Sequence, residues 1–245
     1  MRHQGSHDAI FDLHDDQRVR RVPVDEIVRT LRLAALARDA GDCNDVAAQA
    51  IAAGMSGTML QDVVIPAVAR DLGVRWSADN LAFVDVTIAT ARLQSLVRGL
   101  EASRRGAVVD TLAAEVCVVV PAGVQHTLGA TVLVAQLRER GHAVRFLLGA
   151  TASDVARSLQ RDRPAAVFIS AIALEKLEIL QSVVEKIRRH AHGVHVAIGG
   201  PSIMSATDMK RATGADHVGW DVDDALMHCG LTARPHNAKP AEMIS

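Results

Sequence analysis

The chain turns at Gly123-Val124-Gln125-His126-Thr127-Leu128-Gly129, between an unbroken apolar run at 116–120 and a helical pattern at 130–140. The run indicates a buried strand and the pattern indicates a helix, so this stretch is a strand-to-helix turn. Open α/β sheets bind their ligands at such turns. His126 has a ring nitrogen available for a metal ion or a proton, which makes the turn the first candidate for a functional site.

Downstream of the turn, short apolar runs alternate with amphipathic segments. This alternation predicts a parallel sheet covered by helices on both faces. Ser153 suits the N-cap of one of these helices, with Asp154 in its first turn. Strands are expected at 115–120, 143–148, 165–170, 194–198 and 217–218, and helices at 130–140, 153–161, 175–190 and 206–213.

Upstream of the turn, the apolar spacing is helical. Pro23 suits the start of a first helix. Ser56 suits the N-cap of a third helix, which is expected to kink at Pro66 and end at Gly73. The last helix has apolar residues on more than one side, so it is expected to be covered on two sides. Four helices with short connections predict an antiparallel bundle, the second at 45–53 and the fourth at 79–101.

The predicted fold class is α/β with an N-terminal all-α domain. A four-helix bundle is followed by a doubly wound, parallel, five-stranded Rossmann-like sheet of the flavodoxin-like type. The expected boundaries are a flexible arm at 1–22, the bundle at 23–103, a linker at 104–112, the Rossmann-like domain at 113–230 and a disordered tail at 231–245.

Composition excludes several classes of function. The formal net charge is −1, so the basic footprint of a nucleic-acid binder is missing and no direct specific DNA binding is expected. The three cysteines are odd in number and widely spaced, which favours a reducing cytoplasm over a disulfide framework. No apolar run approaches the roughly 18 residues of a membrane span, so no membrane association is expected.

Unusual residues follow two more of the predicted strands. Ser170 ends the third, and Gly199-Gly200-Pro201 follows the fourth. Glycines let a large ligand approach the backbone, and the serine supplies a hydroxyl group. Taken singly, each has an ordinary alternative: a loop histidine at 126, a strand end, a tight turn. The carboxylates at 221, 223 and 224 are expected in a solvated loop.

Together these residues resemble a known family. The stretches His126-Thr127-Leu128-Gly129, Ser170-Ala171-Ile172 and Gly199-Gly200 are similar to three signatures of the cobalamin-binding Rossmann-like domain: Asp-x-His-x-x-Gly, Ser-x-Leu and Gly-Gly. The resemblance covers about 110 residues. It implies that His126 is the lower axial ligand of cobalt and that the nucleotide tail of the cofactor enters a slot lined by the serine and the glycine pair.

The bundle narrows the resemblance. Trp76, the run Leu81-Ala82-Phe83-Val84-Asp85-Val86-Thr87-Ile88-Ala89 and Arg92-Leu93-Gln94 resemble the helical domain of the AerR/PpaA regulators of photosynthesis genes. That resemblance implies a bundle that covers the upper face of the corrin, and a repressor of the PpsR/CrtJ type as partner. The implied cofactor-binding residues are Trp76, Phe83, Val84, Thr87, Val124, Gln125, His126, Thr127, Leu128, Gly129, Ser170, Ile172, Gly199, Gly200 and Pro201.

Two departures from the related patterns carry information. Val124 stands where the family has an aspartate that orients the histidine, and the loss of such a partner argues against a cobalt that cycles through methyl transfer. Light-sensing cobalamin repressors that have their own DNA-binding domain carry Trp-x9-Glu-His, but counting from Trp76 those positions are Val86 and Thr87 in this chain. The bundle therefore offers no upper histidine ligand. Water, hydroxide or a small alkyl group is expected at the upper position, unless His3, His7 or His14 of the N-terminal arm folds over it.

The resulting hypothesis is a non-enzymatic, cytoplasmic antirepressor that responds to light or redox state. It binds adenosylcobalamin and retains the aquo or hydroxo form after light. Two alternatives stay open: a corrinoid methyl carrier for a methyltransferase system, and an interaction module without cofactor. The sequence leaves the oligomeric state and the preferred upper ligand open.

Overall fold

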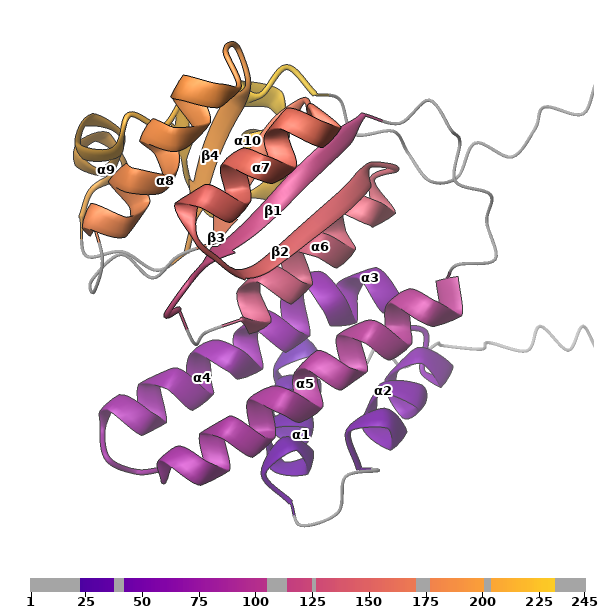
Figure 1. Ribbon diagram of the computed structural model, residues 1–245. Coiled ribbons are helices and arrows are strands. Elements are labelled where there is room, and N and C mark those ends of the chain that lie inside the picture. The colour runs from indigo at the N-terminus through magenta and orange to yellow at the C-terminus, as the bar shows by residue number, and fades with distance from the viewer. Residues whose placement is uncertain are drawn as a thin grey trace, which may run out of the picture.

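The computed structural model describes residues 23–37, 42–104, 114–124, 127–170, 177–200 and 204–231. A helical bundle lies beside an α/β unit, and helix α6 passes between them (Figure 1). The expected arm at 1–22, nearly all of the linker and all but the first residue of the tail lie outside the described residues. So do Gln125, His126, Ile172 and Pro201.

Within the described ranges, five strands form one parallel sheet in the order β2-β1-β3-β4-β5. This confirms the predicted fold class. Valine-rich runs pair in register because their β-branched side chains suit a sheet buried on both faces. The strands are β1 (Glu115–Pro121), β2 (Ala143–Ala150), β3 (Ala166–Ser170), β4 (His195–Gly199) and β5 (His217–Val218).

Side chains of β1 alternate between two cores, as the pleat of a strand requires. Val116, Val118 and Val120 pack toward α6 and α10, whereas Cys117 and Val119 pack toward the opposite helices. The sheet is therefore covered on both faces. One face carries α6 (Leu128–Glu139) and α10 (Val222–His228), and the other carries α7 (Ala152–Asp162), α8 (Leu177–His190) and α9 (Ala206–Thr213).

Two local predictions for this half were wrong. Thr151 caps α7 in place of Ser153, because its hydroxyl accepts from the Asp154 backbone N–H while the Asp154 carboxylate accepts from the Thr151 backbone N–H. The stretch with three aspartates begins helix α10 and is not a solvated loop. The Asp221 side chain caps that helix, and Asp223 accepts two hydrogen bonds from Arg140, at 2.6 and 2.8 Å.

The bundle differs from prediction around its two connections. Gly73 does not end a helix; the helix continues to Ser77, where the Ser77 hydroxyl donates to the Gly73 carbonyl. A π-helical turn ends at Val64, two residues before Pro66. Its wider hydrogen-bond spacing shifts the backbone hydrogen bonds at the place where the proline ring would clash with a regular α-helix. Asp79 has φ 55°, a conformation that stops a helix, so the last helix starts later than expected. The elements are α1 (Val24–Leu36), α2 (Asp42–Ala52), α3 (Gly57–Met59), the π-helix η1 (Leu60–Val64), α4 (Ile65–Ser77) and α5 (Phe83–Arg104).

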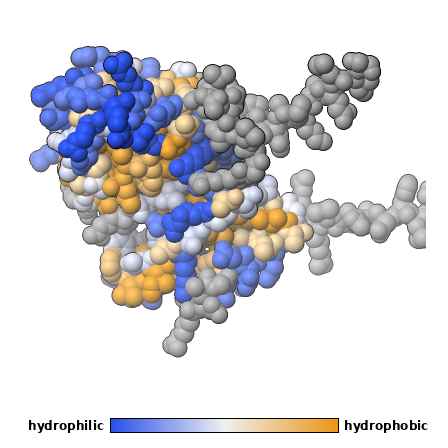
Figure 2. Space-filling view, turned by 45° about the vertical axis from the view of Figure 1, so that its right-hand side comes forward, coloured by the Kyte–Doolittle hydropathy of each residue, from blue (hydrophilic) through white to orange (hydrophobic). Residues whose placement is uncertain are grey.

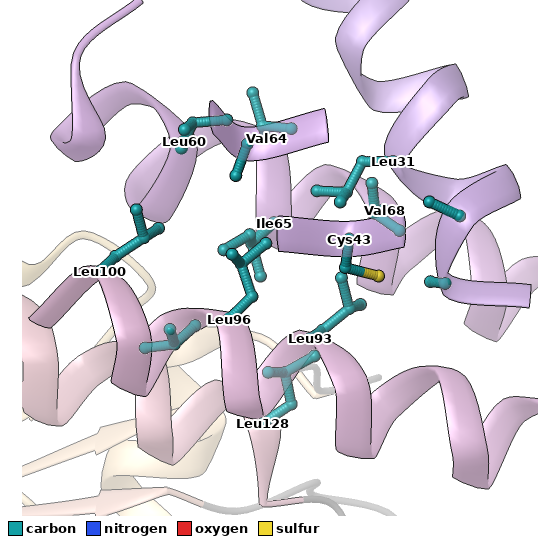
Figure 3. Close-up of a cluster of buried hydrophobic side chains, with 14 of the residues drawn as sticks. Leu31, Cys43, Leu60, Val64, Ile65, Val68, Leu93, Leu96, Leu100 and Leu128 are labelled. Atoms are coloured by element: carbon teal, nitrogen blue, oxygen red, sulfur yellow. The ribbon is translucent and has the colours of Figure 1, made fainter. Parts of the chain in front are cut away.

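Bundle and sheet share part of one hydrophobic core. Leu128, Val132 and Ala135 of α6 belong to the same buried cluster as the bundle residues Leu93 and Leu96 (Figure 3). At the far end of α6, the Arg138 guanidinium lies 2.6 Å from the Glu101 carboxylate of α5. The bundle is thus packed directly on the helix that follows the first strand-to-helix turn.

Candidate functional site

The carboxyl ends of the five strands meet at one edge of the sheet. Ser170 and Gly199 are paired in register at the ends of β3 and β4, so the serine hydroxyl and the glycine pair lie side by side. Both residues are half-buried. Gly200 has φ 135° and Gly123 has φ 82°, conformations that a side chain disfavours. The sequence thus specifies two turns at this edge that only glycine adopts easily.

The glycines of this edge play two different roles. A Cβ atom on Gly199 would lie 3.2 Å from the Gly219 carbonyl oxygen, so a side chain at 199 would push the ends of β4 and β5 slightly apart. A Cβ atom on Gly129 would meet nothing within 4 Å, so the first turn of α6 borders open space. Open space beside a glycine is what a bulky, flat ligand needs in order to approach the backbone.

The turn itself is tied to the bundle. The Gln94 side-chain amide on α5 donates to the Thr127 hydroxyl, at 2.6 Å. Thr127 directly follows His126, which lies outside the described residues, and Leu128 is buried in the core shared with the bundle. Val124 is half-buried and packs against the aliphatic core of the α6 face. Val124, Thr127 and Leu128 are thus held by apolar contacts and by one hydrogen bond to α5.

A hairpin of the bundle exposes apolar residues near this edge. The α4–α5 hairpin, residues 74–88, places the rings of Trp76 and Phe83 6.4 Å apart in a tilted pair. Phe83 and Val84 are each 61% exposed and Trp76 is 39% exposed, so Trp76 is not a buried core anchor. Apolar surface on the bundle is visible in the lower part of Figure 2.

One face of α5 is directed toward the turn. Residues 83, 87 and 94 recur at helical spacing and share a face. Because Gln94 on this face reaches Thr127, the exposed side chains of Phe83 and Thr87 lie on the side of the helix that faces the strand ends. The expectation that α5 is covered on two sides was wrong for this first part: only its later residues, from Ala89 onward, are buried in the bundle core.

Comparison with known proteins fits this geometry. Residues 114–228 match the model of the B12 binding domain. The chain is also 35% identical over 169 residues, 68% of its length, to the uncharacterized 20.5 kDa protein in the bchF-crtJ intergenic region of Rhodobacter capsulatus, of which the match covers 88%. The chain belongs to the B12-binding family.

The fold of this B12-binding protein is also that of a solved corrinoid protein. The structure of the Methanosarcina barkeri monomethylamine corrinoid protein superposes with a TM-score of 0.67, at 14% identity, over 84% of this chain and 97% of that one. At this identity the likeness concerns the fold alone: helices first, then the parallel sheet.

The two cysteines of the sheet domain are poorly suited to bind a metal ion. The Cys117 thiol is buried, which raises its pKa to about 12, and burial raises the pKa of Cys229 to about 11. Neither forms a thiolate near neutral pH, and the thiolate is the form that binds metals. Gly129 borders open space at the first turn of α6, and Phe83 and Val84 of the hairpin are exposed. No helix of the described ranges has the length and apolarity to cross a membrane.

Sequence reasoning missed one residue at this edge of the B12-binding domain. Trp220 lies two residues after the end of β5 and is 73% exposed. Trp220 follows Gly219, which packs closely against Gly199, so its indole adds an exposed flat apolar surface to this edge of the sheet. The available signal was that one of only two tryptophans follows a short strand within two residues.

Proposed function

We propose that this B12-binding protein is a light-responsive regulator, an antirepressor that acts on a repressor protein and does not catalyse a reaction. The name of the Rhodobacter capsulatus relative supports this, because it places that protein's gene next to crtJ. The repressor implied by the AerR/PpaA resemblance is of the PpsR/CrtJ type. Regulators and the genes they affect are often neighbours, so the location favours regulation.

Cobalamin would supply a cobalt–carbon bond that light can break. Residues of this chain would hold it: His126 below the corrin, Ser170 and the glycine pair around the nucleotide tail, and the α4–α5 hairpin above. The exposed Trp76 and Phe83 rings suit the upper position, since covering them with a corrin removes apolar surface from water. They would also keep water away from an alkyl group there.

The bond between Gln94 and Thr127 offers a route from the cofactor to the surface. Thr127 follows the proposed cobalt ligand, and Gln94 lies on the helix that begins in the exposed hairpin. A movement of His126 therefore shifts a residue bonded to α5. A change at the upper face acts on the same helix through Phe83. Both faces of the cofactor would bias one helix, whose exposed residues are then available to a partner.

The carrier hypothesis is weaker because of the position of Val124. This side chain packs among apolar residues and offers no carboxylate to orient an imidazole. A methyl carrier needs a histidine whose basicity is tuned through such a partner.

An absorption experiment tests the proposal. The full chain is loaded with adenosylcobalamin in the dark, separated from free cofactor, and illuminated. Retained corrin bands that shift on illumination, together with altered binding to a PpsR/CrtJ-type repressor, would support it. The His126→Ala variant is expected to lose the corrin after light, and the matched control His190→Ala, an exposed histidine of α8, to retain it. A corrin that is never retained, or a repressor interaction indifferent to cofactor and light, would refute the proposal.

A further inference from the structure

A cluster of three potential metal ligands lies outside the residues assigned above. His217 is in β5, and Asp224 and His228 are one helical turn apart on α10. Their ligand atoms all lie within 4.8 Å of one another. His217 Nε2 is 3.5 Å from Asp224 Oδ2, His228 Nδ1 is 3.2 Å from Asp224 Oδ1, and the two imidazole rings are 4.5 Å apart.

The histidine at the base of the cluster is buried with an unsatisfied nitrogen. His217 is 7% exposed, and its Nε2 atom has no hydrogen-bond partner among the described residues. A buried polar atom without a partner costs free energy, so its retention calls for a ligand. Burial lowers the pKa of His217, although the Asp224 carboxylate opposes this. The ring is therefore neutral near pH 7, which is the form that binds metal ions.

The backbone next to this histidine makes room for its ring. A Cβ atom on Gly219 would lie 2.7 Å from His217 Nε2, so any other residue there would displace the imidazole. Gly219 is itself fixed, because its N–H donates to the Ile198 carbonyl of β4 at 3.1 Å. The unsatisfied nitrogen is thus held beside Asp224 by the sheet, and not by a mobile loop.

We propose that His217, Asp224 and His228 form a site for a divalent transition-metal ion, with Zn²⁺ as the best-suited ion. Two imidazoles and one carboxylate are a donor set that zinc accepts, with water in a fourth position. The two ligands on α10 are about half exposed, which gives the ion access from solvent. This site is separate from the cobalt position and does not depend on the proposed regulatory function.

The ion would fasten α10 to the end of β5. That end lies next to β4, and the last residue of β4, Gly199, and the following Gly200 belong to the expected cobalamin slot. Zinc bound there would hold the backbone on one side of the slot. A metal ion that binds only the folded state also raises stability.

A zinc titration of the full cofactor-free chain tests the site. The probe is Zn²⁺ alone, in competition with a chromophoric chelator, and the readout is the number of ions bound and their affinity. Asp224→Asn and His228→Ala change exposed ligands, so both variants should fold, which circular dichroism checks. His190→Ala is the matched control, because His190 Nδ1 contacts the carbonyl four residues earlier at 2.9 Å, as His228 Nδ1 does.

The expected result is one tightly bound zinc ion fewer in Asp224→Asn and in His228→Ala than in the wild type, or at least tenfold weaker binding. His190→Ala should match the wild type. Zinc should also raise the unfolding temperature of the wild type and the control but not of the two site variants. Equal binding in all four proteins would overturn the proposal. Equal losses in His190→Ala would overturn it too.

Discussion

Phe83→Ala should weaken cobalamin binding while leaving the cofactor-free fold almost unchanged. The side chain is 61% exposed, so little of its burial free energy is used in the cofactor-free protein. Burying a whole phenylalanine side chain is worth about 1.5–3 kcal/mol. Covering the exposed part with a corrin would contribute about 1–2 kcal/mol, which corresponds to a dissociation constant raised about 5- to 30-fold in the variant.

The assay is a titration of cofactor into the protein in the dark, followed by the quenching of tryptophan fluorescence. Leu33→Ala is the control, because Leu33 is 54% exposed but lies on α1 and not in the α4–α5 hairpin. Urea unfolding of the cofactor-free proteins should show a loss of at most about 1.5 kcal/mol for Phe83→Ala, the value of its aromatic pair with Trp76. If Phe83→Ala binds cobalamin as tightly as Leu33→Ala does, the hairpin does not cover the corrin and the reasoning fails.

Three further predictions concern the packing and the pH response. Leu128→Ala should lower the free energy of unfolding by about 2–5 kcal/mol in urea denaturation, because this buried leucine joins α6 to the bundle; a loss below 1 kcal/mol would contradict a shared core. Gln94→Ala and Thr127→Val should each cost about 0.5–1.5 kcal/mol, and the double variant no more than either alone, since both remove one hydrogen bond. Additive losses would show that the bond does not form. In chelator-treated protein, burial lowers the pKa of His217 below its unfolded value of about 6.5. The contribution of neutral His217 to stability is therefore complete above about pH 6.5 and is lost as the pH falls below that value. Unfolding temperatures from pH 7 to 5 should therefore fall less steeply for His217→Gln than for the wild type, and parallel curves would exclude the effect.

The positions of the five strands could be predicted from the sequence because each strand is a short, largely apolar run with strong β propensity. The predictions of helix ends that were wrong depended on interactions between residues that sequence spacing does not reveal. Gly73 looked like a helix end, but Leu72 beside it is buried in the bundle core, and packing of that side chain keeps the segment helical. Thr151 rather than Ser153 caps α7, because the N-cap residue directly precedes the first helical residue, which here is Ala152.

The candidate site shows the same division. Ser170 and the glycine pair could be placed at one edge from the sequence, because parallel strands end together. The zinc ligands could not, because His217 and His228 come together only through α10, a helix of seven residues whose aspartates suggested a loop. The bond between Gln94 and Thr127 joins residues 33 apart in the sequence, and no local pattern predicts such a contact.

The shared core limits how such a regulator can move. Lifting the bundle off α6 would expose Leu128 and Val132, which are 7% and 6% exposed. At about 1.5–3 kcal/mol for each aliphatic side chain, the opened state costs about 3–6 kcal/mol before any polar contact is counted. That corresponds to a population of about 1% or less. The α4–α5 hairpin has a smaller cost, because Phe83, Val84 and Ile88 already face solvent and only Leu81 packs against the bundle core. A signal from the cofactor is therefore expected to rearrange the hairpin over the strand ends, while the rest of α5 stays packed on α6.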